Sequence, residues 1–480
     1  MQRRTLPRRG SPRSIGNPVE PEIGVRSLRD RLQTNDRRTV AGRAASSAVR
    51  LALLGCGTVG EGVVRLLRRN AEMFERKLGA GLELAGVADR SLKPDPSLGL
   101  NSQLITRDPA SLVVRPDVDI VVELFGGQEP ARSLMLKALE AGKDVVTANK
   151  ALLAESGDQI FHTAAKSGRA VGFEASVGGG VPIMRTLREA LAADRQRAVY
   201  GIVNGTCNSI LSMMTDAGTE FADALRQAQE SGLAEADPTL DIEGHDAAHK
   251  LCLLVTLAFG VLLKPAKVYT EGISRVTLAD INYARQLGYT VKLLAIAKDD
   301  GGLIEARVHP TMIPQRHLLA GVSGAFNAIY VHSEALGPTM YYGQGAGQLP
   351  TATAVIADIL EIARHRMAGS RGGAHALGYP TAAVKPARVK PMDDVLCEYY
   401  LRFMARDQPG VLGAIASVLG RNRISIASVI QQGRDIASTV PVIMRTHEAA
   451  ERDLKRALTA IGKLKMVERF PAFIRIEEQL

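Results

Sequence analysis

Apolar runs alternate with helix-like amphipathic segments along residues 51 to about 150. The apolar runs stand at 51–55, 82–89, 118–127 and 143–150. Continuous apolar strands that are separated by helices are typical of a parallel sheet covered by helices on both faces. This part of the chain is therefore predicted to be an α/β domain built on a doubly wound, Rossmann-type parallel sheet.

The pattern changes twice beyond this region. Residues 170–345 mix helices with strand candidates, which predicts an α+β domain, and a second glycine loop then leads into an amphipathic helix at 345–366. A stretch rich in Pro, Lys and Arg at 371–394 has the composition of a linker. The remaining residues, 395–480, follow the order strand, helix, strand, strand, helix, strand, which predicts a ferredoxin-like βαββαβ domain.

The position of the charge excludes a nucleic-acid-binding body. The formal charge is +10, but residues 1–50 hold 12 Arg and four acidic residues and so carry +8 of it. With only 4% aromatic residues, the body also has few stacking platforms for bases. Residues 1–48 have no apolar periodicity and are expected to be a disordered basic extension. Their acidic residues count against a transit peptide.

Cysteine usage and hydropathy point to the cytoplasm. The four cysteines are scattered without a CxxC pair, which disfavours a zinc site and a disulfide framework. The most apolar stretch, 251–263, is shorter than the roughly 20 residues of a membrane span, so no membrane association is expected.

A glycine motif with GxGxxG spacing lies directly after the first predicted strand. Gly55 would permit the tight turn, Gly57 the approach of a pyrophosphate, and Gly60 the close packing of helix on strand. The alternative is a glycine-rich turn without a ligand, and the strand–helix context favours the dinucleotide. Asp89 and Arg90 end the second strand, where an acid can bind a ribose 2′-hydroxyl and an arginine a 2′-phosphate. NAD and NADP therefore both stay open.

Two charged segments supply candidate chemistry. Lys150 follows a strand at the carboxyl edge of the sheet, where it either reaches a ligand or is a solvated lysine at a helix start. Asp246 and Lys250 stand at i and i+4 on one helix face, where an exposed pair would contribute only ~0.3–0.5 kcal/mol. Because Lys250 opens an otherwise apolar helix, we expect it to be desolvated, held by Asp246 and placed to protonate a carbonyl oxygen as a hydride arrives.

Three alternatives accompany this interpretation. His245 and His249 also stand at i and i+4, but HExxH is absent and a structural or solvent-facing role is favoured over a metal site. Cys207 could be the nucleophile of a phosphorylating semialdehyde dehydrogenase, although no base is near it in sequence and an isolated cysteine is more often a small buried residue. The third alternative is a regulator that binds the cofactor and senses an amino acid without catalysis. The presence of Lys250, Glu235 and Asp246 argues against it.

The motifs GCGTVG, TANK, FEASVGGGVPI, NGTCNSI, SGLAEADPTLDIEGHDAAHK and GQGAGQLPTA resemble those of homoserine dehydrogenase in order and spacing. The final ~85 residues resemble an ACT domain through DQPGVL. The resemblance implies NAD(P)-dependent interconversion of L-aspartate 4-semialdehyde and L-homoserine, on the route to threonine, isoleucine and methionine. It makes Lys250 the proton donor with Lys150 beside it, and Glu235, Asp241 and Asp246 the substrate-binding acids.

The resemblance also implies the remaining ligand sites. A structural sodium ion would be held by oxygen atoms, mostly backbone carbonyls, of Glu174, Val177, Gly179 and Val181. Threonine would be the allosteric effector, on a site formed by Asp407, Pro409, Gly410, Val411 and Leu412, with a dimerisation module lacking a ligand as the alternative. The candidate cofactor-binding residues are Gly55, Gly57, Thr58, Val59, Gly60, Asp89, Arg90, Lys150, Gly232, Gly345 and Gly347.

The expected domain organisation follows from these assignments. The dinucleotide-binding domain is expected at 49–182, completed by 345–370, and the substrate-binding and dimerisation domain at 183–344. The linker at 371–394 then leads to the regulatory ACT domain at 395–480. A homodimer or homotetramer is expected.

Overall fold

The computed structural model describes residues 48–480 apart from 370–375, 432–438 and 469–471, so the expected extension at 1–48 lies, except for its last residue, outside the described chain. The described residues belong to one compact unit, and the domain boundaries given above stay a prediction. No helix within these described ranges is long and apolar enough to cross a membrane.

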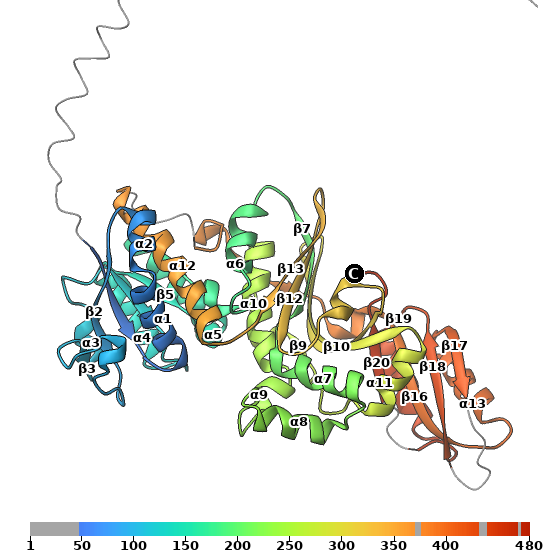
Figure 1. Ribbon diagram of the computed structural model, residues 1–480. Coiled ribbons are helices and arrows are strands. Elements are labelled where there is room, and N and C mark those ends of the chain that lie inside the picture. Colours follow the sequence, from blue (N-terminus) through green and yellow to red (C-terminus); the bar gives the residue numbers. More distant parts are fainter. Residues whose placement is uncertain (1–47, 370–375, 432–438, 469–471) are drawn as a thin grey trace, which may run out of the picture. The chain divides into compact units, whose positions relative to one another are not determined.

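The first part of the chain forms a six-stranded parallel sheet in the order β3-β2-β1-β4-β5-β6 (Figure 1). Its central strands, such as β4 and β5, are buried throughout, as strands covered on both faces must be. The strands are β1 (Val49–Leu54), β2 (Leu82–Ala88), β3 (Ile105–Thr106), β4 (Ile120–Glu123), β5 (Asp144–Thr147) and β6 (Val171–Gly172). This order is the Rossmann order, and it confirms the predicted fold class.

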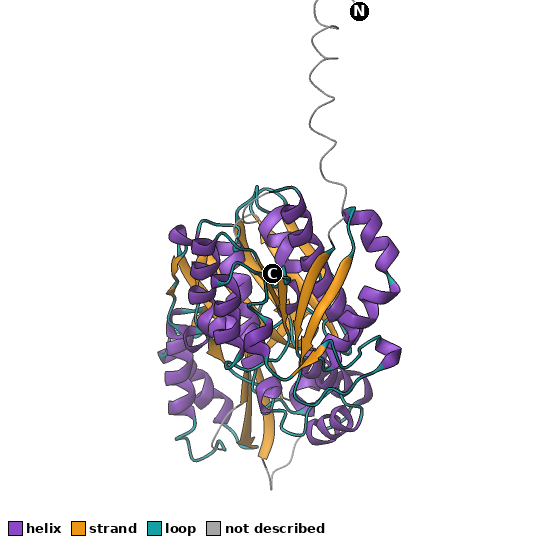
Figure 2. Ribbon diagram, turned by 90° about the vertical axis from the view of Figure 1, so that its left-hand side faces the viewer, coloured by secondary structure: helices purple, strands orange, loops and turns teal. Residues whose placement is uncertain are grey.

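Helices cover this sheet (Figure 2). They are α1 (Thr58–Arg69), α2 (Ala71–Leu78), α3 (Pro109–Leu112), α4 (Ala131–Glu140), α5 (Lys150–Ser167) and α12 (Gln348–Met367). Helix α12 comes from far along the chain and packs against α1, where a Cβ at Gly62 would lie 2.8 Å from the backbone oxygen of Gln348. The second glycine loop thus leads into a helix that packs on the first part of the chain, while the assignment of residues 345–370 to the first domain stays a prediction.

The second part of the chain is built on long antiparallel strands. They are β7 (Gln196–Ile202), β10 (Tyr289–Asp300), β11 (Leu303–Pro314), β12 (Phe326–Ser333) and β13 (Gly337–Gln344). The short strand β9 (Tyr269–Thr270) pairs parallel with β11, and β8 (Val261–Leu262) lies outside this sheet. The helices of this part are α6 (Ile183–Arg185), α7 (Gly205–Ala217), α8 (Phe221–Glu230), α9 (Thr239–Ile242), α10 (His245–Phe259) and α11 (Leu278–Gln286).

Helix α10 has the apolar composition of a core helix. It lies between Gly244 and Gly260, which both have positive φ, and eleven of its residues are buried. A helix that is apolar nearly all round must be enclosed by protein. Its polar first turn, with Asp246, and the following Lys250 are therefore held in place by the packing of the rest of the helix.

The C-terminal residues form the predicted βαββαβ order. Its elements are β16 (Leu396–Arg406), α13 (Val411–Arg421), β17 (Ile426–Gln431), β18 (Thr439–Thr446), α14 (Glu451–Ile461) and β20 (Ala472–Ile476), with a two-residue strand β19 (Ala449–Ala450) before α14. The stretch predicted to be a linker is partly ordered, since β14 (Lys385–Pro386) pairs with β8 and β15 (Arg388–Val389) pairs with β11.

Candidate active site

The glycine motif shapes the N-terminus of helix α1. Gly55 has a φ of +94°, and a Cβ there would lie 2.9 Å from the Leu124 oxygen. A Cβ at Gly60 would lie 2.3 Å from the Gly55 oxygen, which leaves no room for any other residue. At Gly57, by contrast, a Cβ would meet nothing within 4 Å, and no side chain caps the helix. The first-turn amides therefore face open space and fit a phosphate group.

Asp89 lies beside this loop, as the Rossmann geometry requires. Its carboxylate accepts hydrogen bonds from the backbone amides of Cys56 at 2.9 Å and Ser91 at 2.8 Å. Burial acts to raise the pKa of Asp89, but these hydrogen bonds lower it overall. Arg90 is exposed. Burial and the nearby Asp89 raise the pKa of the Cys56 thiol to about 11, so this cysteine is not a reactive thiolate.

A buried carboxylate that the sequence analysis did not single out organises the neighbouring strand ends. Glu123 is fully buried and accepts hydrogen bonds from the Thr147 hydroxyl at 2.6 Å and the Phe125 amide at 2.8 Å. Asn149 caps helix α5 and donates to the Gly127 oxygen at 2.7 Å. The ELFGG and TANK segments are therefore tied together at the start of α5, where Lys150 stands.

Asp246 joins lysines from two parts of the chain. Its Oδ2 lies 2.6 Å from Nζ of Lys250, and its Oδ1 lies 3.2 Å from Nζ of Lys150. Lys250 also donates to the Val203 backbone oxygen at 2.6 Å. The side chain of Lys250 is 11% exposed and that of Lys150 is 40% exposed, so Lys150 is the more solvated of the two. Burial acts to raise the pKa of Asp246, but Lys250 and Lys150 together hold it well below its ordinary value.

Asn204 connects Asp241 and Asp246, two carboxylates of the acidic segment 235–246. Its side-chain amide donates to Asp241 at 2.7 Å and to Asp246 at 2.9 Å, while its oxygen caps helix α7. Thr206 lies 3.1 Å from the other Asp241 oxygen. Only the cysteine of this segment, NGTCNSI, is a candidate on the sequence alone. An asparagine directly before a predicted helix is a capping signal that could have drawn attention to Asn204.

The other predicted site residues differ in their surroundings. Gly345 adjoins this cluster, because Asn327, on which it packs, donates its side-chain amide to the Val203 oxygen at 3.2 Å. Glu235 and Gly232 are in an exposed loop, and the Glu235 carboxylate makes no hydrogen bond or ion pair with any residue that the structure describes. Gly345 is packed so closely that a Cβ would lie 2.1 Å from the side chain of Asn327. Gly347 has a φ of +118° and directly precedes α12.

The predicted metal-binding loop has a carboxylate that is already satisfied. The Glu174 side chain accepts hydrogen bonds from the amides of Met184 at 3.0 Å and Arg185 at 2.8 Å. The loop abuts the second glycine segment, because a Cβ at Gly179 would lie 2.5 Å from the Gly345 oxygen. Within the described residues, no group of three or more His, Cys, Asp or Glu side chains could hold a metal ion. Any ion here would therefore rely on backbone oxygens.

Cys207 is a core residue in this fold. It is fully buried, and its thiol donates to the Asp241 backbone oxygen at 3.1 Å. Burial and the nearby acids raise the pKa of this thiol well above its ordinary value, which opposes a nucleophilic role.

We therefore expect Cys207→Ala to keep turnover within about threefold of the wild type and to reduce stability by about 1 kcal/mol. Steady-state kinetics and thermal denaturation test this. A complete loss of turnover in a folded variant would instead make the thiol the nucleophile.

A dinucleotide-type loop on a Rossmann sheet, with a desolvated lysine on a buried carboxylate, defines an NAD(P)-dependent oxidoreductase. The sequence matches the homoserine dehydrogenase family at residues 182–360, its NAD-binding domain at 55–174 and the ACT domain at 399–465. The chain belongs to the homoserine dehydrogenase family.

Individual relatives agree with this assignment. The homoserine dehydrogenase of Neisseria gonorrhoeae is 47% identical over 429 residues, which cover 89% of this chain and 98% of that protein. The Pseudomonas aeruginosa enzyme is 43% identical over 90% of this chain and 99% of that protein. A homoserine dehydrogenase structure from Thiobacillus denitrificans has a TM-score of 0.84 and 44% identity, covering 90% of this chain and 98% of that one. A hyperthermophilic archaeal homoserine dehydrogenase, solved with NADPH, has a TM-score of 0.57 and 27% identity and covers 66% of this chain and 97% of that chain.

Proposed function

We propose that the chain interconverts L-aspartate 4-semialdehyde and L-homoserine and that Lys250 exchanges the proton at the substrate oxygen. The observation that carries this proposal is the position of Lys250, nearly buried and bonded to Asp246 at 2.6 Å. A primary ammonium held in this way can give its proton to a developing alkoxide and take it back in the reverse direction. The test is the homoserine-dependent reduction of NADP and NAD, followed spectrophotometrically.

The surrounding residues would bind and orient the substrate. Glu235, Asp241 and Asp246 are proposed to bind the substrate through its ammonium group. Lys150, whose side chain is 40% exposed at the start of α5, is proposed to bind near the reacting carbon. NAD(P), when bound at the α1 N-terminus, supplies or accepts the hydride.

Cofactor preference is expected to depend on Arg90. This exposed arginine follows Asp89, whose carboxylate is already engaged with the Cys56 and Ser91 amides. A charge-assisted contact with a 2′-phosphate contributes about 1.5–3 kcal/mol. Arg90→Ala should therefore raise the KM for NADP by about tenfold or more and leave the KM for NAD unchanged. Equal changes in both constants would contradict this role.

Regulation by threonine is proposed to act through the turn before α13. Gly410 has a φ of +90° at the helix start, and Asp407 lies three residues earlier. Deleting the ACT domain would also remove strand β20, which pairs with β11, so a point substitution in this turn is the sharper test. We expect Asp407→Ala to raise the threonine concentration for half inhibition by about tenfold, with unchanged rates in its absence. Unaltered inhibition would place the effector elsewhere.

Three further assignments accompany this function. We propose that a sodium ion is bound by backbone oxygens of Val177 and Gly179, which accept no hydrogen bond from the described residues, with Glu174 and Val181 as its other ligands.

We propose a cytoplasmic enzyme because all four cysteines are free. A homodimer or homotetramer is expected, with the molecular mass in solution as its test.

A further inference from the structure

The last strand of the ACT domain also belongs to the antiparallel sheet that contains β7, β10 and β11. Strand β20 pairs with β16 of its own domain and, on its other edge, runs parallel to β11, with Arg475 opposite Thr311 and Ile476 opposite Met312. Glu477 continues this contact, donating its amide to the Met312 oxygen at 3.0 Å. The two domains are therefore joined by backbone hydrogen bonds as well as by packing.

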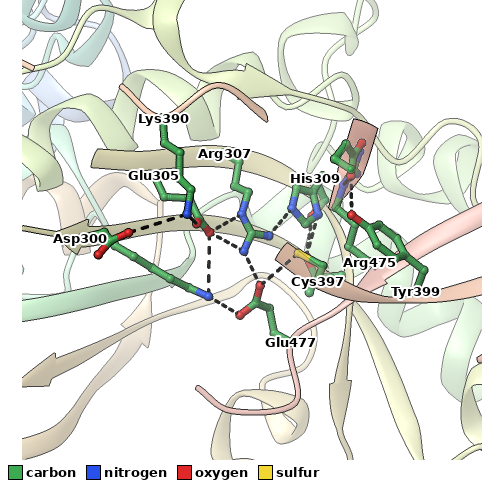
Figure 3. Close-up of polar contacts among 12 residues, drawn as sticks. Asp300, Glu305, Arg307, His309, Lys390, Cys397, Tyr399, Arg475 and Glu477 are labelled. Atoms are coloured by element: carbon green, nitrogen blue, oxygen red, sulfur yellow. Dashed lines mark hydrogen bonds and ion pairs between the residues drawn. The ribbon is translucent and has the colours of Figure 1, made fainter. Parts of the chain in front are cut away.

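Arg475 gathers charged and polar groups from both domains in the interior. Figure 3 shows it near His309 and Tyr399. Its side chain is 1% exposed and lies 2.6 Å from Glu451 of helix α14. The nitrogen that contacts Glu451 also donates to the Tyr269 hydroxyl at 2.9 Å. The other terminal nitrogen lies 2.8 Å from Glu271, directly after strand β9. A planar guanidinium fixes several acceptors in one geometry. Glu271 is therefore held by a group that belongs to the ACT domain.

The segment that carries Glu271 is pressed against the acidic segment of the active site. The Ile273 amide donates to the Ile242 oxygen at 2.8 Å. A Cβ at Gly272 would lie 2.2 Å from that same oxygen, so the two backbones are in direct contact. On its other side, the Glu271 amide donates to the Val308 oxygen of β11 at 2.8 Å. The segment has little freedom to move independently of either neighbour.

The contacted residues directly adjoin the substrate-binding carboxylates. Ile242 follows Asp241, and Gly244 is the N-cap of helix α10, two residues before Asp246. Gly244 itself touches the neighbouring segment, because a Cβ there would lie 3.2 Å from the Thr270 side chain. A displacement of residues 270–273 would therefore move the backbone between Asp241 and Asp246.

We infer that Arg475 and Glu271 are positioning residues for substrate binding. They fix the segment 270–273, which in turn sets the spacing of Asp241 and Asp246. The inference rests on the proposed function, because it concerns the carboxylates assigned there to the substrate. It makes the ACT domain a structural part of the substrate site and not only a carrier of an effector.

The test is the KM for homoserine in Glu271→Ala, whose native side chain is 28% exposed and so tolerates truncation. We expect this KM to rise about tenfold, with the KM for NADP unchanged and kcat within about threefold, because a small displacement of binding groups is costly. Glu271→Gln keeps an oxygen that accepts from Arg475 and should recover most of the affinity.

Lys298→Ala is the matched control. Lys298 pairs with Glu477 at 2.8 Å, so it also anchors the C-terminal segment, but through β10 and without contact with residues 270–273. The KM for homoserine of Lys298→Ala should stay at the wild-type value. The melting temperatures of all variants are measured to compare their stability. The inference fails if Glu271→Ala keeps its KM within twofold of the wild type, or if Lys298→Ala raises it equally. In either case the wild-type enzyme would still turn over homoserine and still depend on Lys250. If the proposed function itself is wrong, the wild-type enzyme would show no homoserine turnover.

Discussion

Lys250→Ala is expected to lower kcat by roughly 10²–10⁴, which is the range contributed by a positioned general acid or base. The ammonium lies 2.6 Å from Asp246 and 2.6 Å from the Val203 oxygen, so its position is fixed by two partners before any substrate arrives. Lys150 is not expected to replace Lys250 as the proton donor, because its side chain is 40% exposed and contacts the other carboxylate oxygen of Asp246.

Binding and chemistry are separable in this variant. The glycine motif lies in another part of the chain, so the dissociation constant for NADPH, measured by fluorescence titration, should be unchanged. The turnover number comes from steady-state assays in both directions. A folded Lys250→Ala enzyme with wild-type kcat would remove Lys250 from the mechanism.

Asp246→Asn is expected to impair both stability and activity. The substitution keeps the shape of the side chain but leaves Lys250 nearly buried without its counter-ion. Removing one partner of a buried ion pair costs about 3–5 kcal/mol. The ion pair of Asp246 with Lys150 contributes less to stability, because Lys150 is partly exposed and solvent screens its charge. Without the charge of Asp246, Lys250 is also no longer held in place, so kcat/KM should fall by at least about a hundredfold.

The pH dependence of the free energy of unfolding provides a second measurement of the stability contributed by the Asp246 ion pair. Its pKa is lowered in the folded state, so the unfolded state binds its proton first as pH falls. The wild type should therefore keep this contribution above about pH 4, the ordinary carboxyl pKa, and lose it progressively in more acidic solution. Asp246→Asn should lack that part of the acid dependence. Identical unfolding curves for the two proteins between pH 2 and pH 7 would contradict the ion pair.

The domain folds could be predicted because their signals are local. The alternating buried strands and helices from 51 to 150 specify the parallel sheet, and the βαββαβ order is legible from the last 85 or so residues. The pairing of β20 with β11 could not be predicted, because it joins residues about 160 positions apart and depends on which sheet edge is left open. The stretch 371–394 was predicted to be a linker from its composition, yet β14 and β15 form there because neighbouring strand edges accept them.

Part of the site could also be predicted, because some of its residues are close together in the sequence. Asp246 and Lys250 are neighbours on one helix, so their i, i+4 spacing alone indicated the pair. Lys150 lies nearly a hundred residues earlier, and its contact with Asp246 depends on how the helices α5 and α10 pack. Asn204 was missed because its role, bridging Asp241 and Asp246, exists only after α7 and α10 are brought together.

Chemical rescue of Lys250→Ala by small primary amines tests most directly whether Lys250 transfers the proton. If the ammonium of Lys250 acts in this way, added methylamine should restore turnover in proportion to its concentration, and amines of different pKa should follow a Brønsted relation. Asp246→Asn, which retains its lysine, should not respond. A folded, NADPH-binding Lys250→Ala enzyme that no amine accelerates would contradict the assignment.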